Sequence, residues 1–236
     1  MSASTYTSAI QPERTPGGIR LLDSLAWVPY VVLTIVHVTA LATHNPFAAP
    51  TKLTLMPLLT LPVLLAAPRL RPRSALALLL GALLFSLLGD GAGTFFPVGS
   101  ELPLMLLFFG IAHLGYIALF LRYARVRRLP WWTLIYAAWW VGMLIVIGPH
   151  TGSLLFAVAG YGLVLAGTAV SSARCHPIVA VGGAFFLTSD SLLAFRLFLP
   201  DTAPEWMSPA VMLTYTLGQG LIVYGVLRTL AIRDSR

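Results

Sequence analysis

Apolar residues form long runs along this chain, and short polar stretches separate the runs. Eight apolar segments can be drawn, at residues 25–43, 51–66, 74–90, 102–122, 131–148, 152–170, 177–198 and 208–230. A helix needs about 20 residues, with a range of roughly 17–25, to cross the hydrocarbon core of a bilayer. The pattern therefore predicts an all-α, polytopic transmembrane bundle of eight helices.

The second and third segments are shorter than the others, and the second contains Pro57 and Pro62. Proline removes a backbone hydrogen-bond donor, so we expect either a kinked helix here or helix ends that neighbouring helices cover. Seven spanning helices with one re-entrant segment is the alternative to eight.

The composition favours a membrane protein over a soluble one. Hydrophobic residues make up 58% of the chain and charged residues 10%, whereas a soluble domain has about 25% charged residues. The formal net charge of +7 comes largely from arginines between the apolar runs, so it indicates membrane topology and not binding to nucleic acid. The single cysteine, Cys175, cannot form an intrachain disulfide.

We expect a polar N-terminal tail at residues 1–22, a single transmembrane domain at 23–230 and a C-terminal tail at 231–236. The first tail has no charged leader followed by a short apolar stretch, so no signal peptide is expected. Most Lys and Arg residues lie in the tails and in the links that follow the second, fourth and sixth segments. The positive-inside rule then predicts a multi-pass protein, in the cell membrane if the source is bacterial, with both termini in the cytoplasm.

A few ionisable residues lie within the apolar segments. Asp90 is in the third segment, His113 in the fourth and Asp190 in the seventh, and Lys52 begins the second. Counting about 1.5 Å per residue from the predicted segment ends places these groups, with Gln219, in the middle-to-outer half of the membrane. Charged groups at that depth are costly and face the bundle interior, where they mark functional sites.

Other polar residues share helix faces with these groups, as Ser86 does with Asp90 at a spacing of four. The candidates for binding a substrate are Lys52, Ser86, His113, Tyr116, Ser189, Tyr215 and Gln219. A purely structural role is the alternative for Ser86, His113, Ser189 and Gln219, and extension of the side chain to the outer membrane interface is the alternative for Lys52. We expect His37 to form a hydrogen bond between helices, and we expect Arg196 to lie at the outer membrane interface.

A short match indicates an internal repeat. Phe85 and Phe185 each precede an aspartate, Asp90 or Asp190, by five positions. The two aspartates lie on segments that run in the same direction in the predicted topology. Two four-helix halves in parallel orientation account for this match.

Four stretches resemble the YhhN-like membrane proteins, the lysoplasmalogenase family. They are "TKLTLMPLL" at 51–59, "LLFSLLGD" at 83–90, "FFGIAHLGY" at 108–116 and "GGAFFLTSDSLLAF" at 182–195. The second and fourth carry the G-D and S-D motifs of the family. The chain departs from the family at Leu53, where proline often follows the lysine, and in its glycine-rich stretch after Asp90. Both departures lie beside the expected site and bear on the substrate more than on the fold.

The resemblance implies hydrolysis of the vinyl ether bond of a lysoplasmalogen, a lysophospholipid in the bilayer. The products are a fatty aldehyde and glycerophosphoethanolamine or glycerophosphocholine, and no cofactor is implied. The family's proposed catalytic pair of aspartates matches Asp90 and Asp190. The spacing of Asp90, Asp190 and His113 is not diagnostic of a metal site.

The residues fit this chemistry. Vinyl ethers hydrolyse by protonation of the β-carbon, and water then attacks the oxocarbenium ion. Two carboxyl groups in a site of low dielectric favour a state in which one is protonated and the other ionised, as glycosidases also use two carboxyl groups. Which of Asp90 and Asp190 is the acid stays open. We expect His113, Tyr116 and Gln219 to position water or the leaving oxygen.

We expect Lys52 to bind the phosphate as a point charge. The main rival function is a proton-coupled transporter of a small or lipid-like solute, which would also place carboxylates inside the membrane. A retinal-binding receptor needs a lysine deep in a helix, and Lys52 lies at a helix end. A purely structural role is the remaining alternative.

Overall fold

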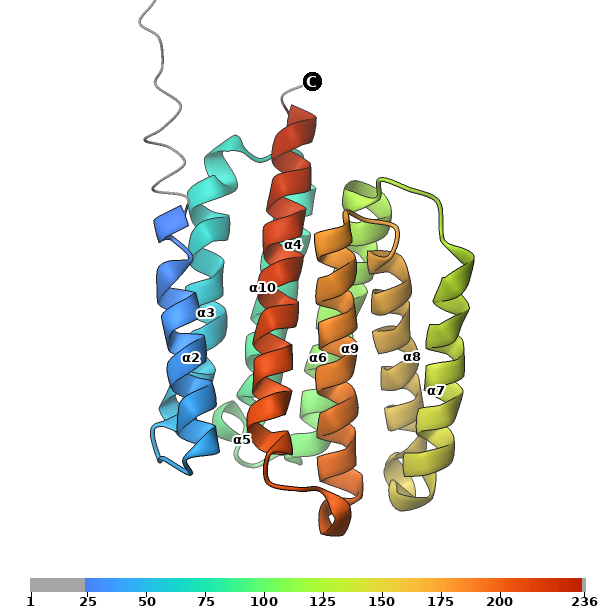
Figure 1. Ribbon diagram of the computed structural model, residues 1–236. Coiled ribbons are helices and arrows are strands. Elements are labelled where there is room, and N and C mark those ends of the chain that lie inside the picture. Colours follow the sequence, from blue (N-terminus) through green and yellow to red (C-terminus); the bar gives the residue numbers. More distant parts are fainter. Residues whose placement is uncertain (1–23, 235–236) are drawn as a thin grey trace, which may run out of the picture.

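In the described part of the chain, eight long helices run alternately up and down through one bundle (Figure 1). The structure is a computed structural model that describes residues 24–234. The long helices are α2 (Val28–Ala42), α3 (Ala48–Ala66), α4 (Arg73–Asp90), α6 (Glu101–Leu119), α7 (Leu134–Ile147), α8 (Leu155–Ser172), α9 (Pro177–Phe198) and α10 (Met207–Asp234). A short helix, α5 (Ala92–Phe95), follows α4, and the π-helical turn η2 (Phe120–Ala124) extends α6.

Seven of these helices, with their short extensions, are long and apolar enough to cross a membrane. The exception is α2, which is apolar but has 15 residues. The all-helical, membrane-spanning class predicted from the sequence is therefore confirmed, while the count of eight spans and the orientation stay predictions. In Figure 1, α2 begins and α10 ends at the same end of the bundle, as an even number of crossings requires.

The predicted segments correspond closely to the observed helices. Pro57 and Pro62 both lie inside α3, which continues through them. The short helix α5 has no counterpart among the predicted segments. Helix α10 continues to Asp234, past residue 230. The N-terminal tail predicted at residues 1–22 lies outside the described residues, and the domain limits stay predictions.

Helices α9 and α10 form the closest helix pair, and two glycines face each other where they meet. A Cβ on Gly182 would lie 2.9 Å from the carbonyl oxygen of Gly218, and a Cβ on Gly218 would lie 2.9 Å from the amide nitrogen of Phe186. Small residues allow this approach of two backbones inside a membrane. The contact fixes α9, and Asp190 with it, against α10.

The contacts repeat between the two halves of the chain. Helix α4 packs extensively on α6, and α9 packs extensively on α10. These are the third and fourth long helices of each half, and Asp90 and Asp190 lie on the third ones. This arrangement supports the parallel repeat that the sequence predicts.

Helix α7 is the least buried of the spanning helices. Ile147 is the one residue buried within it, and its contacts are chiefly with α8 and α9 at the edge of the bundle (Figure 1). Much of α7 therefore faces lipid, and its inner face is not fully packed.

We predict that Gly218→Ala lowers the free energy of unfolding by about 1–3 kcal/mol, because the added methyl group overpacks the α9–α10 contact. The matched control is Gly142→Ala on α7, where a Cβ meets nothing within 4 Å. That change is expected to leave stability unchanged or to raise it by up to about 1 kcal/mol, since alanine favours helix over glycine. Thermal unfolding of both variants in mild detergent tests this, and equal effects would contradict the account of the contact.

Candidate functional site

Two neighbouring hollows lie inside the bundle, with residues of α6 and α9 between them. The first, here called the polar chamber, has a volume of about 250 Å³. Its polar lining residues are His37, Lys52, Asp90, Ser189, Asp190, Arg196, Ser208 and Tyr215. The second, here called the apolar slot, has about 60 Å³ and lies between α6, α7, α8 and α9. Four residues line both hollows: Met105, Phe109, Asp190 and Leu193.

Asp90 lies at the last position of α4 and is held from two sides. The Tyr215 hydroxyl on α10 donates a hydrogen bond of 2.8 Å to its Oδ2. The Lys52 Nζ on α3 lies 4.0 Å from its Oδ1. The aspartate side chain is 5% exposed, and that of the lysine is 37% exposed. The ammonium group and the hydroxyl both stabilise Asp90 in its ionised form.

A buried hydrogen-bond network lies behind Asp90, and Gln219 is its centre. The Gln219 Nε2 donates to the Ser86 hydroxyl at 3.0 Å, and its Oε1 accepts a hydrogen bond of 2.5 Å from the Tyr116 hydroxyl. The same Nε2 lies 3.5 Å from the hydroxyl oxygen of Tyr215. Three of the predicted site residues thus form one network that positions Tyr215 toward Asp90.

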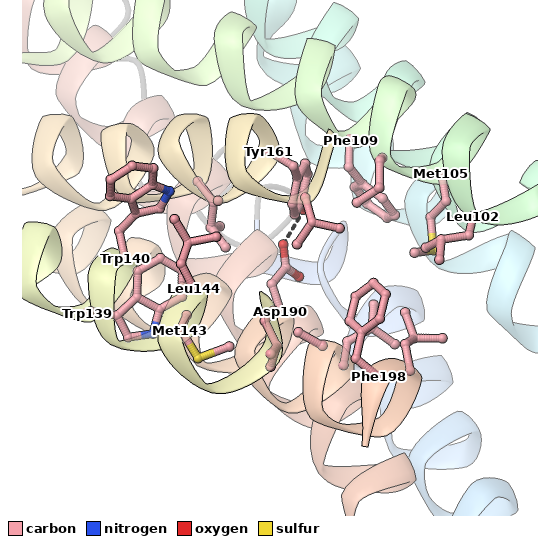
Figure 2. Close-up of a pocket in the computed structure, with 18 residues that line it drawn as sticks. Leu102, Met105, Phe109, Trp139, Trp140, Met143, Leu144, Tyr161, Asp190 and Phe198 are labelled. Atoms are coloured by element: carbon pink, nitrogen blue, oxygen red, sulfur yellow. Dashed lines mark hydrogen bonds between the residues drawn. The ribbon is translucent and has the colours of Figure 1, made fainter. Parts of the chain in front are cut away.

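Asp190 lies on α9 and lines both the polar chamber and the apolar slot. The Tyr161 hydroxyl on α8 donates a hydrogen bond to its Oδ2, as the dashed line in Figure 2 shows. The His113 Nε2 on α6 lies 3.7 Å from the same oxygen. Asp190 therefore has a neutral hydroxyl and an imidazole as neighbours, whereas Asp90 has an ammonium group.

The other ring nitrogen of His113 indicates its tautomer. Its Nδ1 lies 3.0 Å from the Thr168 hydroxyl oxygen, and that hydroxyl donates to the Val164 carbonyl oxygen at 3.2 Å. A hydroxyl that donates there accepts a hydrogen bond from His113 Nδ1, which fits the tautomer with a proton on Nδ1. His113 Nε2 then lies beside Asp190 and 3.4 Å from the Tyr161 hydroxyl oxygen.

Ser189 also lines the polar chamber, next to Asp190. Its hydroxyl donates a hydrogen bond of 2.9 Å to the Val211 carbonyl oxygen on α10. This bond joins α9 to α10 beside the Asp190 carboxyl group. The contact that Ser189 makes is therefore a contact between helices.

The site contains residues that the sequence did not single out. Tyr161 and Thr168 are seven positions apart on α8, two helical turns, and they contact Asp190 and His113. The seven-residue spacing places both side chains on one face of α8 and could have indicated a shared role. The small apolar residues around Tyr161 made that face look like ordinary helix packing. Arg196, expected at the outer interface, and His37, expected to be structural, both line the polar chamber.

One ring nitrogen of His37 forms a hydrogen bond between helices, and the other ring nitrogen lacks a partner in the described residues. Its Nδ1 lies 2.8 Å from the Thr51 hydroxyl oxygen, and the hydroxyl donates to the Phe47 carbonyl oxygen at 2.7 Å. Its Nε2 is buried and has no hydrogen-bond partner within the part of the chain that the structure describes. A buried nitrogen without a partner is costly, so this atom is a candidate for contact with a bound molecule.

The chamber carries two cations, Lys52 and Arg196, and two carboxyl groups. Among residues 24–234, no group of three or more His, Cys, Asp or Glu side chains is placed to hold a metal ion. The arrangement suits a ligand with an anionic group near the cations and a reacting bond near the carboxyl groups.

The fold and the site together define a multi-pass membrane protein with a pair of carboxyl groups buried inside its helical bundle. A model of the YhhN family matches residues 47–226. That range covers most of the chain, from the start of α3 into α10, and the chain therefore belongs to the YhhN family. No curated protein and no solved structure matches the chain.

We predict that Gln219→Leu lowers the free energy of unfolding by about 2 kcal/mol, because it removes the amide that hydrogen-bonds to the buried hydroxyls of Ser86 and Tyr116. The control is Thr188→Val on α9, an exposed position whose hydroxyl bonds only to its own helix. That change is expected to have little effect. Thermal unfolding in detergent compares the two, and an equal loss in both variants would contradict the importance of the network.

Proposed function

We propose that this protein is a membrane-embedded hydrolase that cleaves the vinyl ether bond of lysoplasmalogens. The products are a fatty aldehyde and glycerophosphoethanolamine or glycerophosphocholine. One observation carries the proposal: Asp90 and Asp190 line one cavity, and Asp190 also lines the neighbouring apolar slot. Membership of the YhhN family, which is known to include hydrolases, supports it.

The position of Asp190 supports its role as the acid. A vinyl ether is protonated on its β-carbon, the carbon on the hydrocarbon side of the bond. Asp190 lines the apolar slot, and Asp90 does not. Tyr161 bonds to Oδ2 of Asp190, which leaves Oδ1 to carry the proton toward the substrate.

The partners of Asp90 support the complementary role. Lys52 and Tyr215 stabilise an ionised carboxylate, which is the form that takes a proton from water. As water attacks the oxocarbenium carbon, Asp90 receives one of its protons and a hemiacetal forms. Asp90 then gives this proton to the leaving glycerol oxygen, while Asp190 takes the proton of the hemiacetal hydroxyl as the aldehyde forms. Both groups return to their starting states, and one water is consumed for each bond cleaved.

The cations of the chamber support binding of a phosphorylated head group. Lys52 and Arg196 lie on α3 and α9 and line the same hollow, and together they suit the negative charge of a phosphodiester. The neutral His37 Nε2 can accept a hydrogen bond from a glycerol hydroxyl or from the ammonium group of ethanolamine. The head group would therefore occupy the polar chamber, with its ether end toward the carboxyl groups.

Aldehyde release from a lysoplasmalogen by the purified protein tests the proposal. We expect Asp90→Asn and Asp190→Asn each to lower kcat by about 10²–10⁴-fold, the usual contribution of a positioned acid or base. Asp201→Asn is the matched control, since Asp201 is exposed in the short turn after α9. No release by the wild-type protein, or undiminished release by both site variants, would contradict the proposal.

The head-group assignment gives a separate prediction. Lys52→Met and Arg196→Gln are each expected to raise KM about tenfold for a phosphorylated substrate, because one charge-assisted contact to the phosphate is lost. An uncharged vinyl ether glycerol lacks that phosphate, so the same changes are expected to affect its KM little. Arg122→Gln, outside both hollows, is the control. Equal increases in KM for both substrates would contradict phosphate binding by these cations, whereas a lower kcat for both substrates with Lys52→Met follows from its contact with Asp90.

Proton-coupled transport of a small or lipid-like solute is the rival. Its support is the repeat of two halves around buried carboxyl groups. Uptake driven by a proton gradient into proteoliposomes, without aldehyde release, would favour transport over hydrolysis.

A further inference from the structure

We propose that the apolar slot between α7 and helices α6, α8 and α9 binds one unbranched hydrocarbon chain and holds its polar end at Asp190. The proposal rests on the proposed function for the identity of the reacting bond, but the binding of the chain can be measured without any reaction.

The lining of the slot specifies an apolar ligand. Leu, Ile, Val, Met, Phe and Trp side chains make up most of its wall, and Asp190 is its one carboxyl group. Both tryptophan N–H groups of the wall have partners: Trp139 donates to the Ser191 hydroxyl at 3.1 Å and Trp140 donates to the Ala159 carbonyl oxygen at 3.0 Å. The indoles therefore offer only carbon surface to a ligand. Apart from Asp190 and the Tyr161 hydroxyl that it engages, the slot provides nothing for a polar molecule.

The position of Asp190 gives the slot its direction. In Figure 2, the Asp190 carboxyl group lies between the α7 side chains, such as Trp139 and Met143, and the α6 side chains Phe109 and Met105. Phe109 and Met105 also line the polar chamber. A molecule with a charged head in the chamber and a hydrocarbon tail in the slot would thus pass Asp190 where its two parts join.

The slot has no room for a second chain. It is much smaller than the chamber, at about 60 Å³ against about 250 Å³, so its side chains must move apart for even one chain to enter between the four helices. One of its walls is the inner face of α7, the helix with the fewest buried residues. A chain could reach the slot from the bilayer along α7, and a second chain on the same glycerol would have to remain in the lipid. The slot therefore takes one chain of a lipid.

The test uses a lysophosphatidylethanolamine analogue with a saturated ether link and a photoreactive diazirine near the end of its chain. This probe cannot be hydrolysed as a vinyl ether. After illumination of the wild-type protein in lipid nanodiscs, we expect labels on slot residues of α7 and α9, such as Met143, Leu144 and Leu197, and unlabelled lysolipid in excess should remove them. Labels spread evenly over lipid-facing residues, or labels that do not respond to competitor, would overturn the proposal.

A matched pair of variants adds a second readout. Ala194→Phe fills the slot, and Ala138→Phe adds the same ring to an exposed position of α7 outside the slot. Overpacking of this kind is expected to reduce labelling by the probe about tenfold in Ala194→Phe, with no change in Ala138→Phe. Equal labelling in both folded variants would overturn the proposal. If Ala194→Phe does not fold, the label map of the wild-type protein decides.

The outcomes for the two proposals are separate. Competable labelling of the slot without aldehyde release would support the chain site and contradict the hydrolase. Aldehyde release with diffuse labelling would support the hydrolase and overturn the chain site.

Discussion

The cost of burying two carboxyl groups inside a membrane bundle is the constraint on which the rest of this structure depends. An isolated charge in that environment is strongly unfavourable, so each aspartate needs partners that the fold must deliver. Asp90 receives an ammonium group from Lys52 and a hydroxyl from Tyr215. Asp190 receives a hydroxyl from Tyr161 and faces the His113 imidazole. The α3–α4 and α8–α9 contacts bring Lys52 to Asp90 and Tyr161 to Asp190.

The partners follow one geometric plan and differ in chemistry. Each aspartate lies on the third long helix of its half of the chain. Each is met by a side chain from the second helix of the same half, on α3 or α8, and by one from the fourth helix of the other half, on α10 or α6. A parallel duplication explains the plan. The partners on α3 and α8 support the proposed division of acid and base roles, because a lysine stabilises a carboxylate and a tyrosine hydroxyl does so less strongly.

Much of the fold could be predicted because each spanning helix carries its signal in its own sequence. The apolar runs gave helix positions close to those of α3, α4 and α9, and the aspartates were recognisable because charges within such runs are rare. Residues whose importance depends on which helices are neighbours could not be found in this way. Tyr161 matters because α8 lies beside α9, and Arg196 matters because its end of α9 borders the polar chamber. The slot depends on how loosely α7 packs, which no periodicity in the sequence reports.

The central claim is that the two carboxyl groups divide acid and base roles, and proton exchange in D₂O tests it most directly. With Asp90→Asn, water attack is impaired while Asp190 can still protonate the vinyl ether and take a proton back. The account predicts that recovered lysoplasmalogen then gains deuterium at its β-carbon, as mass spectrometry would show, and that no deuterium enters with Asp190→Asn. Deuterium uptake with Asp190→Asn and none with Asp90→Asn would contradict the account and reverse the two roles.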